Sequence, residues 1–314
     1  MAAELDFAAM GSHVHLVVVG PEEIADEARR RVEQLEGRWS RFRPDSEVSR
    51  LNASQGELVA VSADTSALLR TAVEAWRMSG GLVDCTMLDA LEAAGYDTSF
   101  EAIPEDRPAR AGSALPASLL GPSDIEVAGA TAGLPPGLRF DPGGIGKGLA
   151  ADIVSSEAMA RGAEGVCINI GGDLRVSGVA PSGGDWTIGV EHPRRSSPVV
   201  LLGLREGAVA TSTTLRRAWR VGGRSVHHLI DPRTGAPSES PTVLATAVAA
   251  SGWMAETLAK ATLLRGEHPF DLVGGSDAEA IVVTHDGTVS ASPGLQRFTG
   301  HTEPPISILE EVAS

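Results

Sequence analysis

Hydrophobic and polar residues alternate over residues 13–19, and this alternation predicts a strand with one buried face. Two longer stretches predict helices. Residues 21–42 carry acidic side chains at the start and arginines near the end, as the helix dipole favours. Residues 62–78 begin with Ser and Asp and are followed by Gly80 and Gly81, which are suited to a helix end. The N-terminal third therefore combines a strand with helices.

The second half of the chain reads mainly as strands. Helices are predicted over residues 149–161 and 252–264. The expected strands are 166–170, 174–176, 186–190, 199–204, 209–212, 226–230, 242–248, 280–283 and 288–290. Residues 101–124 are rich in Pro, Ala and Ser and predict an irregular connection, and the last dozen residues a loose tail. Without steady alternation of strand and helix, the pattern predicts an α+β fold with mixed helices and a mainly antiparallel sheet.

Length and charge narrow the class of protein. A chain of 314 residues can bury a large core as one domain or two, and we expect one domain over residues 1–314. The formal net charge of −15 argues against nucleic-acid or anionic-membrane partners, which need a basic surface. Cys85 and Cys167 lie in apolar runs and are expected to be buried free thiols. The sequence has no basic, apolar leader and no segment of transmembrane length, so we expect a cytoplasmic protein.

The segment from Asp141 to Asp152 is the most informative for function. It places four glycines and Lys147 just ahead of the helix predicted over residues 149–161. Glycine permits close backbone approach, and a helix N-terminus favours an anion, so the segment is typical of a phosphate cradle. Asp141 and Gly148 exclude a P-loop, and Leu149 excludes a dinucleotide fingerprint. A Gly-rich turn that only caps a helix explains the segment equally well.

Other polar segments lie at predicted strand or helix ends. They are Ala9–Ser12, Arg41–Asn52, Asn169–Asp173 and His227–Gly235. Taken singly, each has an ordinary explanation, because Gly-Gly-Asp and Asp-Pro-Arg-Thr-Gly are common turn sequences. A pair of histidines in a strand is more often structural than catalytic.

Taken together and in this order, the segments resemble the FAD:protein FMN transferase family, also called ApbE-like, from Met10 to about residue 264. The matching motifs are Met10-Gly-Ser12, the Ser40 to Asn52 pattern, Gly81-Leu-Val-Asp-Cys-Thr86, Asp141 to Gly148, Asn169-Ile-Gly-Gly-Asp173, Ala210-Thr-Ser-Thr213 and His228 to Gly235. The resemblance implies an ApbE-like, T-fold-like architecture.

The resemblance also implies a reaction. Such enzymes use magnesium to cleave the pyrophosphate of FAD, transfer FMN to a Thr or Ser of an acceptor protein, and release AMP. The flavin site is then expected at Met10, Phe42, Leu82, Val83, Asp84, Asp141, Lys147 and Leu229. The catalytic candidates are His228, Lys147 and Asp231. His228 is the candidate base for the acceptor hydroxyl, because an imidazole titrates near neutral pH, although it could merely order the following turn.

The metal position departs from the family pattern. The resemblance places the metal at the Gly144 carbonyl and at positions 256 and 260, where the family has Asp and Thr and this chain has Glu256 and Lys260. An ammonium cannot ligate a metal. Three interpretations stay open: magnesium binds with water in the lost position, Lys260 takes the metal's place, or Glu256 and Lys260 form a plain helix pair. Thr213 replaces a Gly of the family pattern, and Phe42 lacks the hydroxyl of Tyr.

Three functions follow from these observations. The chain is expected to be an FMN transferase with FAD and Mg²⁺ as cofactors and a Thr/Ser acceptor protein as partner. It could instead be an FAD-binding carrier, sensor or scaffold that has lost activity. A third alternative is an FAD pyrophosphatase, in which water replaces the acceptor. Lys260 separates the first from the second.

Overall fold

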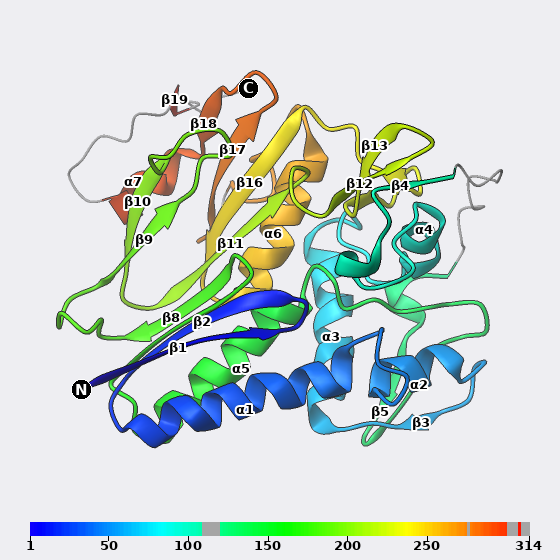
Figure 1. The fold of residues 1–314 in the computed structure, drawn as a ribbon, viewed down its shortest axis with the longest axis horizontal. Coiled ribbons are helices and arrows are strands. Elements are labelled where there is room, and N and C mark those ends of the chain that lie inside the picture. Colours follow the sequence, from blue (N-terminus) through cyan, green and yellow to red (C-terminus); the bar gives the residue numbers. More distant parts are fainter. Residues whose placement is uncertain (109–119, 275–276, 300–306, 309–314) are drawn as a thin grey trace. The chain divides into compact units, whose positions relative to one another are not determined.

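Two compact units make up the chain. The computed structural model describes residues 1–108, 120–274 and 277–299, and the backbone of 307–308 (Figure 1). The first unit comprises Met1–Glu33, Lys147–Thr213 and Ser240–Ser314, and the second comprises Gln34–Gly146 and Thr214–Glu239. Each unit is built from segments distant in sequence, and the single domain over 1–314 stays a prediction.

A nine-stranded sheet forms the centre of the first unit. Its order is β1-β2-β7-β8-β11-β16-β17-β18-β19, and its neighbours are antiparallel except for the parallel pair β18 and β19. The strands are β1 (Ala2–Ala9), β2 (Ser12–Val19), β7 (Gly165–Ile170), β8 (Asp173–Gly178), β11 (Gly207–Thr213), β16 (Thr242–Ala249), β17 (Glu279–Thr284), β18 (Val289–Ala291) and β19 (Ser307–Ile308). The mainly antiparallel sheet is as predicted.

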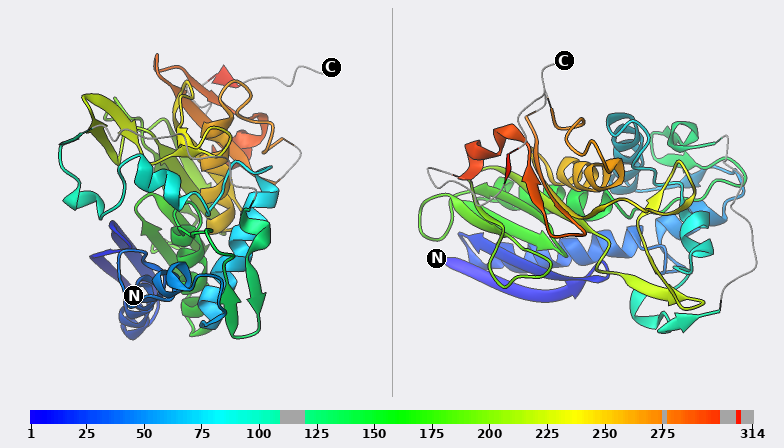
Figure 2. Two further views of the ribbon diagram at one scale, coloured as in Figure 1. Left: turned by 90° about the vertical axis from the view of Figure 1, so that its right-hand side faces the viewer. Right: turned by 90° about the horizontal axis from the view of Figure 1, so that it is seen from above.

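One face of this sheet carries helices (Figures 1 and 2). They are α1 (Glu22–Trp39), which continues into the second unit, α5 (Gly146–Ala160) and α6 (Gly252–Arg265). Helix α6 packs on β11 and β16, which bury Ala210, Ala245 and Ala247. These small side chains let the helix backbone lie close to the sheet.

The opposite face is covered by a hairpin of β9 (Trp186–Val190) and β10 (Val200–Leu204), and by the short helix α7 (Gln296–Thr299). Between hairpin and sheet lies an apolar core that includes Trp186, Leu202, Val209, Leu244 and Ile281. Alternate residues of β11 and β16 thus serve two cores: valine and leucine face the hairpin, and alanine faces α6.

The second unit is mostly helices with small sheets. Its helices are α2 (Glu47–Ala53), α3 (Ala63–Met78) and α4 (Leu88–Ala93), with short 3₁₀ helices at Phe100–Ala102 and Pro122–Asp124. Its sheets are β3-β6-β5, β13-β12-β4 and the pair β14-β15. These strands are β3 (Val59–Ala60), β4 (Asp106–Arg107), β5 (Glu126–Ala128), β6 (Thr131–Gly133), β12 (Ala218–Val221), β13 (Arg224–His227), β14 (Ile230–Asp231) and β15 (Ala236–Pro237).

The predicted elements are largely confirmed, with specific differences. Helix α3 begins at Ala63, one residue after the predicted start, and Ser62 is its N-cap, whose hydroxyl accepts from the Thr65 N–H at 3.3 Å. Strand β1 was not predicted, the strand expected over 226–230 is divided between β13 and β14, and α5 begins at Gly146 rather than at residue 149. The predicted irregular connection holds β4 and two short 3₁₀ helices, while residues 109–119 and most of the predicted tail lie outside the described residues.

Both cysteines are buried free thiols, as expected. Burial raises the pKa of the Cys167 thiol to about 12, which keeps it protonated near neutral pH. Within the described residues, no helix is both long and apolar enough to cross a bilayer.

Helices α5 and α6 touch backbone to backbone at a pair of glycines. A Cβ added to Gly148 would lie 2.3 Å from the carbonyl oxygen of Gly252, and one added to Gly252 would lie 2.4 Å from that of Gly148. No side chain other than hydrogen fits at either position, because both neighbours are backbone atoms. This contact explains why glycines occupy the first turn of each helix despite their low helix propensity.

Replacing Gly252 with Ala is therefore expected to force the two helices apart and to lower the free energy of unfolding by about 1–3 kcal/mol, the usual cost of overpacking. Gly37 of α1 is the matched control, since a Cβ there meets nothing within 4 Å. Gly37→Ala should stabilise the protein by about 0.5–1 kcal/mol. Urea denaturation of both variants measures the difference, and equal effects would contradict the steric argument.

Candidate functional site

Lys147 lies between two carboxylates in the first unit. Its ammonium pairs with Asp173 at the start of β8, and with Oε1 of Glu256 on α6 at 2.9 Å. The other Glu256 oxygen accepts the backbone N–H of Gly148 at 2.8 Å. Both carboxylates are buried, with side chains 4% and 5% exposed. Both Glu256 oxygens are therefore already engaged.

Asp152 makes the reciprocal connection from α5 to α6. Its two oxygens accept the N–H groups of Gly252 and Trp253 at 2.7 and 3.1 Å, while the hydroxyl of Ser251, at the usual N-cap position, makes no cap hydrogen bond. Burial raises the pKa of Asp152, although these hydrogen bonds and Arg175 favour the carboxylate. Each helix N-terminus is thus capped by an acid of the other helix.

The motifs at 10–12 and 169–173 meet at one end of the sheet. Met10 and Gly11 form the tight turn between β1 and β2, with φ of 54° and 62°. The Gly171 N–H donates to the His13 carbonyl at 3.0 Å, and Asn169 accepts the Gly172 N–H at 2.8 Å. The following residue is Asp173, so this turn sets the position of the acid that holds Lys147.

Asp141 organises the corresponding part of the second unit. One oxygen accepts the Gly143 N–H at 2.5 Å, and the other pairs with the buried Arg41 guanidinium at 2.5 Å. The preceding residue, Phe140, exchanges two backbone hydrogen bonds with the Asn52 side chain. The Asp141 N–H donates to the Cys85 carbonyl at 2.7 Å. Three separate sequence motifs therefore converge on this aspartate.

An aromatic cluster lies next to this ion pair. The Arg41 guanidinium lies over Phe42 and Tyr96, 4.0 and 4.8 Å from the ring centroids. Tyr96 also contacts Phe42 and Trp219, with centroids 6.0 and 5.6 Å apart. Phe42 is 41% exposed, so much of its ring is accessible for stacking.

The other predicted flavin contacts in the second unit differ in exposure. Leu82, Val83 and Leu229 are buried. Asp84 is half-buried and accepts from both the N–H and the hydroxyl of Thr86, at 2.7 and 2.5 Å. Their contact with a flavin stays a prediction.

The two histidines at the end of β13, His227 and His228, occupy different environments. His227 bonds to the Ser238 carbonyl at 3.0 Å and accepts the Leu229 N–H at 3.3 Å, and burial lowers its pKa. His228 is half-buried just after β13. Asp231 is buried and held by a bidentate Arg233. Burial raises the pKa of Asp231, but the hydrogen bonds and charge of Arg233 outweigh this and lower it.

The predicted residues therefore fall into two groups. The first unit holds Met10, Lys147, Glu256 and Lys260 together with the turn at Asp173. The second holds Phe42, Leu82, Val83, Asp84, Asp141, Gly144, His228, Leu229 and Asp231. A single site that uses both groups stays a prediction.

The residues at positions 256 and 260 do not suit a magnesium ion. Both Glu256 oxygens are engaged by Lys147 and Gly148, and Lys260 offers no lone pair. The plain helix pair considered above is also not formed, since no ion pair or hydrogen bond joins Glu256 to Lys260.

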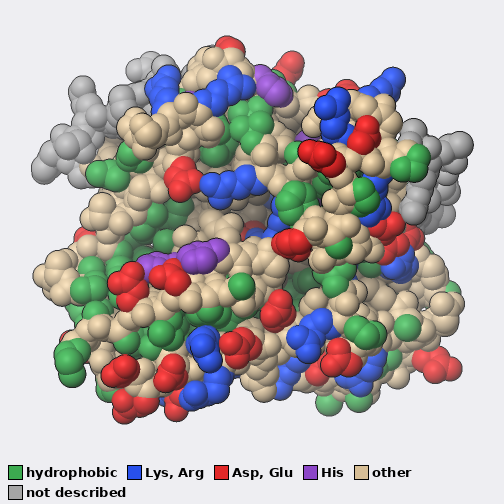
Figure 3. All heavy atoms as spheres, viewed as in Figure 1, with side chains coloured by type: hydrophobic (Ala, Val, Ile, Leu, Met, Phe, Trp, Pro, Cys, Tyr) green, Lys and Arg blue, Asp and Glu red, His purple; other side chains and the backbone are tan. Residues whose placement is uncertain are grey.

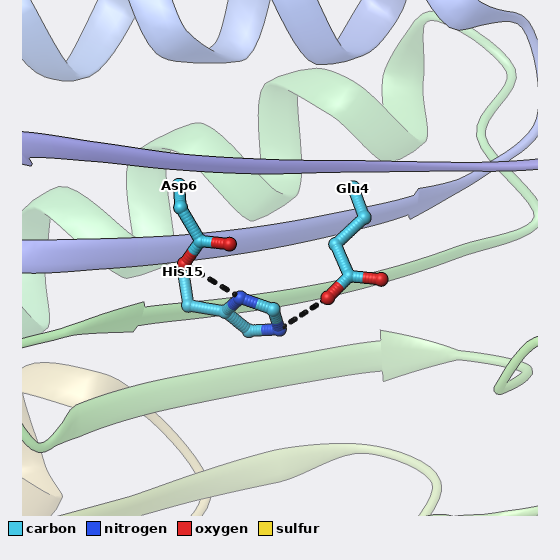
Figure 4. Close-up of side chains that lie close together, drawn as sticks. All are labelled: Glu4, Asp6 and His15. Carbon is cyan, nitrogen blue, oxygen red and sulfur yellow. Dashed lines mark hydrogen bonds and ion pairs between the residues drawn. The ribbon is translucent and has the colours of Figure 1, made fainter.

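A different group of possible metal ligands lies on β1 and β2. Within the described chain, the ligand atoms of Glu4, Asp6 and His15 lie within 4.8 Å of one another (Figure 4). Histidine and acidic side chains are visible together over these strands in Figure 3. The contacts are explained by His15 itself, which binds Asp6 at 3.1 Å and Glu4 at 3.7 Å. Exposed groups of this kind are common without an ion, and none of the three belongs to the predicted site.

Comparison with known proteins decides the family. The family model described as "ApbE family" matches residues 10–282. The chain belongs to the ApbE family. The match to the family therefore extends over most of the chain and includes all of the motifs noted above.

Curated relatives carry the name FAD:protein FMN transferase. The Vibrio cholerae protein is 29% identical over 297 residues, covering 88% of this chain and 86% of its own length. The Haemophilus influenzae protein is 25% identical and covers 82% of this chain and 79% of its own length. The solved ApbE structure from Thermotoga maritima has a TM-score of 0.85 at 26% identity, covering 96% of this chain and all of that one. The Pseudomonas stutzeri flavinyl transferase ApbE, at 24% identity, has a TM-score of 0.81 over 96% and 98% of the two chains and supports the fold.

The sequence analysis did not identify two residues that organise the site, Arg41 and Asp152. Arg41 lies inside the motif from Ser40 to Asn52, but its partner Asp141 is distant along the chain. Asp152 ends the segment first considered as a cradle, yet its partners Gly252 and Trp253 are also distant. Local patterns carry no signal for either pairing, because both depend on the tertiary fold.

Tyr96 gives a pH-dependent probe of the aromatic cluster. Burial raises its pKa above the ordinary value of 10.0. The protonated phenol is thus favoured by folding, and its contribution to stability is complete below the unfolded pKa and lost as pH rises through the folded pKa. Tyr96 is the only tyrosine, so ultraviolet absorbance reports its ionisation directly.

We expect the midpoint pH of Tyr96 ionisation to be higher in the native protein than in the urea-unfolded protein. The stability of the wild type relative to Tyr96→Phe should fall as pH rises from about 10. Coincident native and unfolded midpoints would show that Tyr96 is not in the buried setting described here.

Proposed function

We propose that this protein is an FAD:protein FMN transferase, which moves FMN from FAD to a Thr or Ser hydroxyl of an acceptor protein and releases AMP. The observation that carries the proposal is the family match over residues 10–282, together with curated relatives of that name aligned over most of this chain. The geometry supports it through the convergence of the family's motifs on Asp141 in one unit and on Lys147 in the other.

Phe42 is the side chain best suited to stack on the flavin ring. It is one of the few large hydrophobic side chains that are exposed, and the Arg41 guanidinium, lying 4.0 Å from its centroid, fixes its surroundings. Met10, Leu82, Val83 and Leu229 would supply apolar contacts, as the family resemblance implies. Asp84 and Asp141 would then act mainly by shaping the loops, because each accepts hydrogen bonds from its own turn.

The transfer is a phosphoryl-type substitution. The acceptor hydroxyl oxygen bonds to the phosphorus of the FMN half, the bond to the AMP phosphate breaks, and AMP leaves with the electron pair. The hydroxyl proton passes to a base, for which we propose His228, with Asp231 ordering the following turn through Arg233. The chemistry therefore needs positioning, a proton acceptor and neutralisation of the pyrophosphate charge.

Lys147 supports this arrangement indirectly. Its ammonium is held by Asp173 and Glu256, so it is tied to the first turn of α5. We assign it a positioning role beside the nucleotide. Residues 256 and 260 would not supply ligands for magnesium in this mechanism, because the Glu256 oxygens are engaged by Lys147 and Gly148 and Lys260 cannot ligate.

Two other functions make different predictions for the same assay. An FAD pyrophosphatase would release AMP and free FMN without labelling a protein. An FAD-binding carrier, sensor or scaffold would bind FAD and release neither product. The change at position 260 is the observation that favours the FAD-binding carrier, sensor or scaffold as an alternative.

The test is incubation with FAD and an acceptor domain that carries a Thr or Ser flavinylation motif, with magnesium present in one series and a chelator in the other. An FMN-sized mass gain on the acceptor supports transfer. AMP without labelling supports hydrolysis, and bound FAD without either product would refute both enzymatic functions.

His228→Ala is expected to slow transfer by about 10²–10⁴-fold, the usual contribution of a general base, while FAD affinity changes only a few-fold. His285→Ala is the matched control, because His285 is exposed and only its backbone N–H is bonded, to the Pro241 carbonyl. Mass spectrometry of the acceptor follows the rate. Unchanged transfer in His228→Ala would leave this histidine with only a turn-ordering role.

A further inference from the structure

Lys260 of α6 is a largely buried lysine whose ammonium makes no hydrogen bond or ion pair with any described residue. Only 9% of its residue surface is exposed, yet its Nζ is not one of the fully buried polar atoms of the described chain, so the ammonium keeps access to solvent. Lysine is almost never buried unless it is paired, because the charge loses its hydration. The described residues therefore leave this ammonium without an acceptor and open to a ligand.

The choice of lysine at this position is itself informative. Lys147 and Lys260 are the only lysines in a chain with 26 Lys and Arg residues. Lys147 contacts Glu256, which is one helical turn from Lys260. A compact ammonium acts as a point charge, whereas the planar guanidinium of Arg needs room for a fork of donors. Glu256, the acidic side chain at the expected metal position, therefore has Lys147 as an ion-pair partner and Lys260 one turn along the same helix.

The local charges disfavour a metal ion beside Glu256. The Glu256 charge is shared by the Lys147 ammonium at 2.9 Å and the Gly148 N–H at 2.8 Å. A dication placed here would compete with Lys147 for the same oxygens and would be repelled by Lys260. An anion meets the opposite situation, because the Lys260 ammonium has three donors and no acceptor among the residues that the structure describes.

We propose that Lys260 binds a phosphate oxygen of the FAD pyrophosphate directly, in place of a metal ion, so that this protein binds FAD without a divalent cation. The inference rests on the proposed function, which supplies FAD as the ligand. The ligand class is a dinucleotide pyrophosphate, and a flavin without phosphate should not use Lys260. The apo protein then carries an unpaired charge that the ligand neutralises.

Binding measurements separate this role from others. The dissociation constants of FAD and riboflavin are measured by flavin fluorescence or calorimetry, with chelator and with magnesium. For the wild type, we expect FAD affinity to be equal in both conditions. Lys260→Met should weaken FAD binding by about 10- to 100-fold, the range for a hydrogen bond to a charged group, and leave riboflavin binding unchanged.

Two further variants sharpen the result. Arg265→Met removes a cation from the same helix, one that is paired with Asp271 at 2.6 Å, and should leave FAD binding unchanged. Lys260→Thr with Glu256→Asp restores the family's residues, and its FAD binding should become dependent on magnesium. Lys260→Met without ligand should unfold at a higher denaturant concentration than the wild type, because an apolar side chain replaces a cation that no described residue pairs at a largely buried position.

The outcomes are distinct. FAD binding by the wild type that is lost with chelator and restored by magnesium would overturn the inference. Unchanged FAD affinity in Lys260→Met, or an equal loss for FAD and riboflavin, would also overturn it. Failure of the wild type to bind FAD under any condition would instead refute the proposed function, and is thereby distinguished from failure of the Lys260 role.

Discussion

The contact on which the first unit depends is the reciprocal capping of α5 and α6. Glu256 of α6 accepts the Gly148 N–H, and Asp152 of α5 accepts the N–H groups of Gly252 and Trp253. Where two helices begin inside a protein, their first N–H groups have no partners within the helix. Each such buried N–H group left unsatisfied costs about 1–3 kcal/mol of stability. Exchanged acids satisfy them, and glycine at both crossing points permits the approach. Neither helix N-terminus is completed by its own sequence alone.

This construction determines what the acidic residue at position 256 can do. A carboxylate that caps a helix and holds Lys147 is fixed in orientation, which favours a precise site. The same engagement removes it as a free metal ligand. Glu256 therefore caps α5 and cannot also serve as a free metal ligand. Any cation beside an anionic substrate would then have to be supplied by another residue. Lys260, one helical turn away, supplies a charge that no other described residue neutralises.

Local patterns predicted the elements well, because strands and helices differ in period and caps have sequence signatures. Strand β9 has the predicted bounds, and α3 begins one residue after its predicted start. The start of α5 was placed three residues late, since glycines at Gly146 and Gly148 oppose a helix unless tertiary contacts favour it. Ordered motifs identified the family, but the Arg41–Asp141 pair joins residues too far apart in sequence for any local rule.

The net charge of the whole protein affects how this site could bind an anionic ligand. With a net charge of −15, the chain gains no general attraction for an anionic dinucleotide, so affinity must come from fixed local cations and hydrogen-bond donors. A buried ammonium interacts strongly with a phosphate because little water screens it, yet it carries half the charge of a magnesium ion. If Lys260 binds the pyrophosphate as proposed, it would stabilise bound FAD more than it would neutralise the charge that develops on the departing AMP phosphate. Under the proposed function, holding FAD and cleaving it are separate electrostatic problems, and a lysine at position 260 would favour the first.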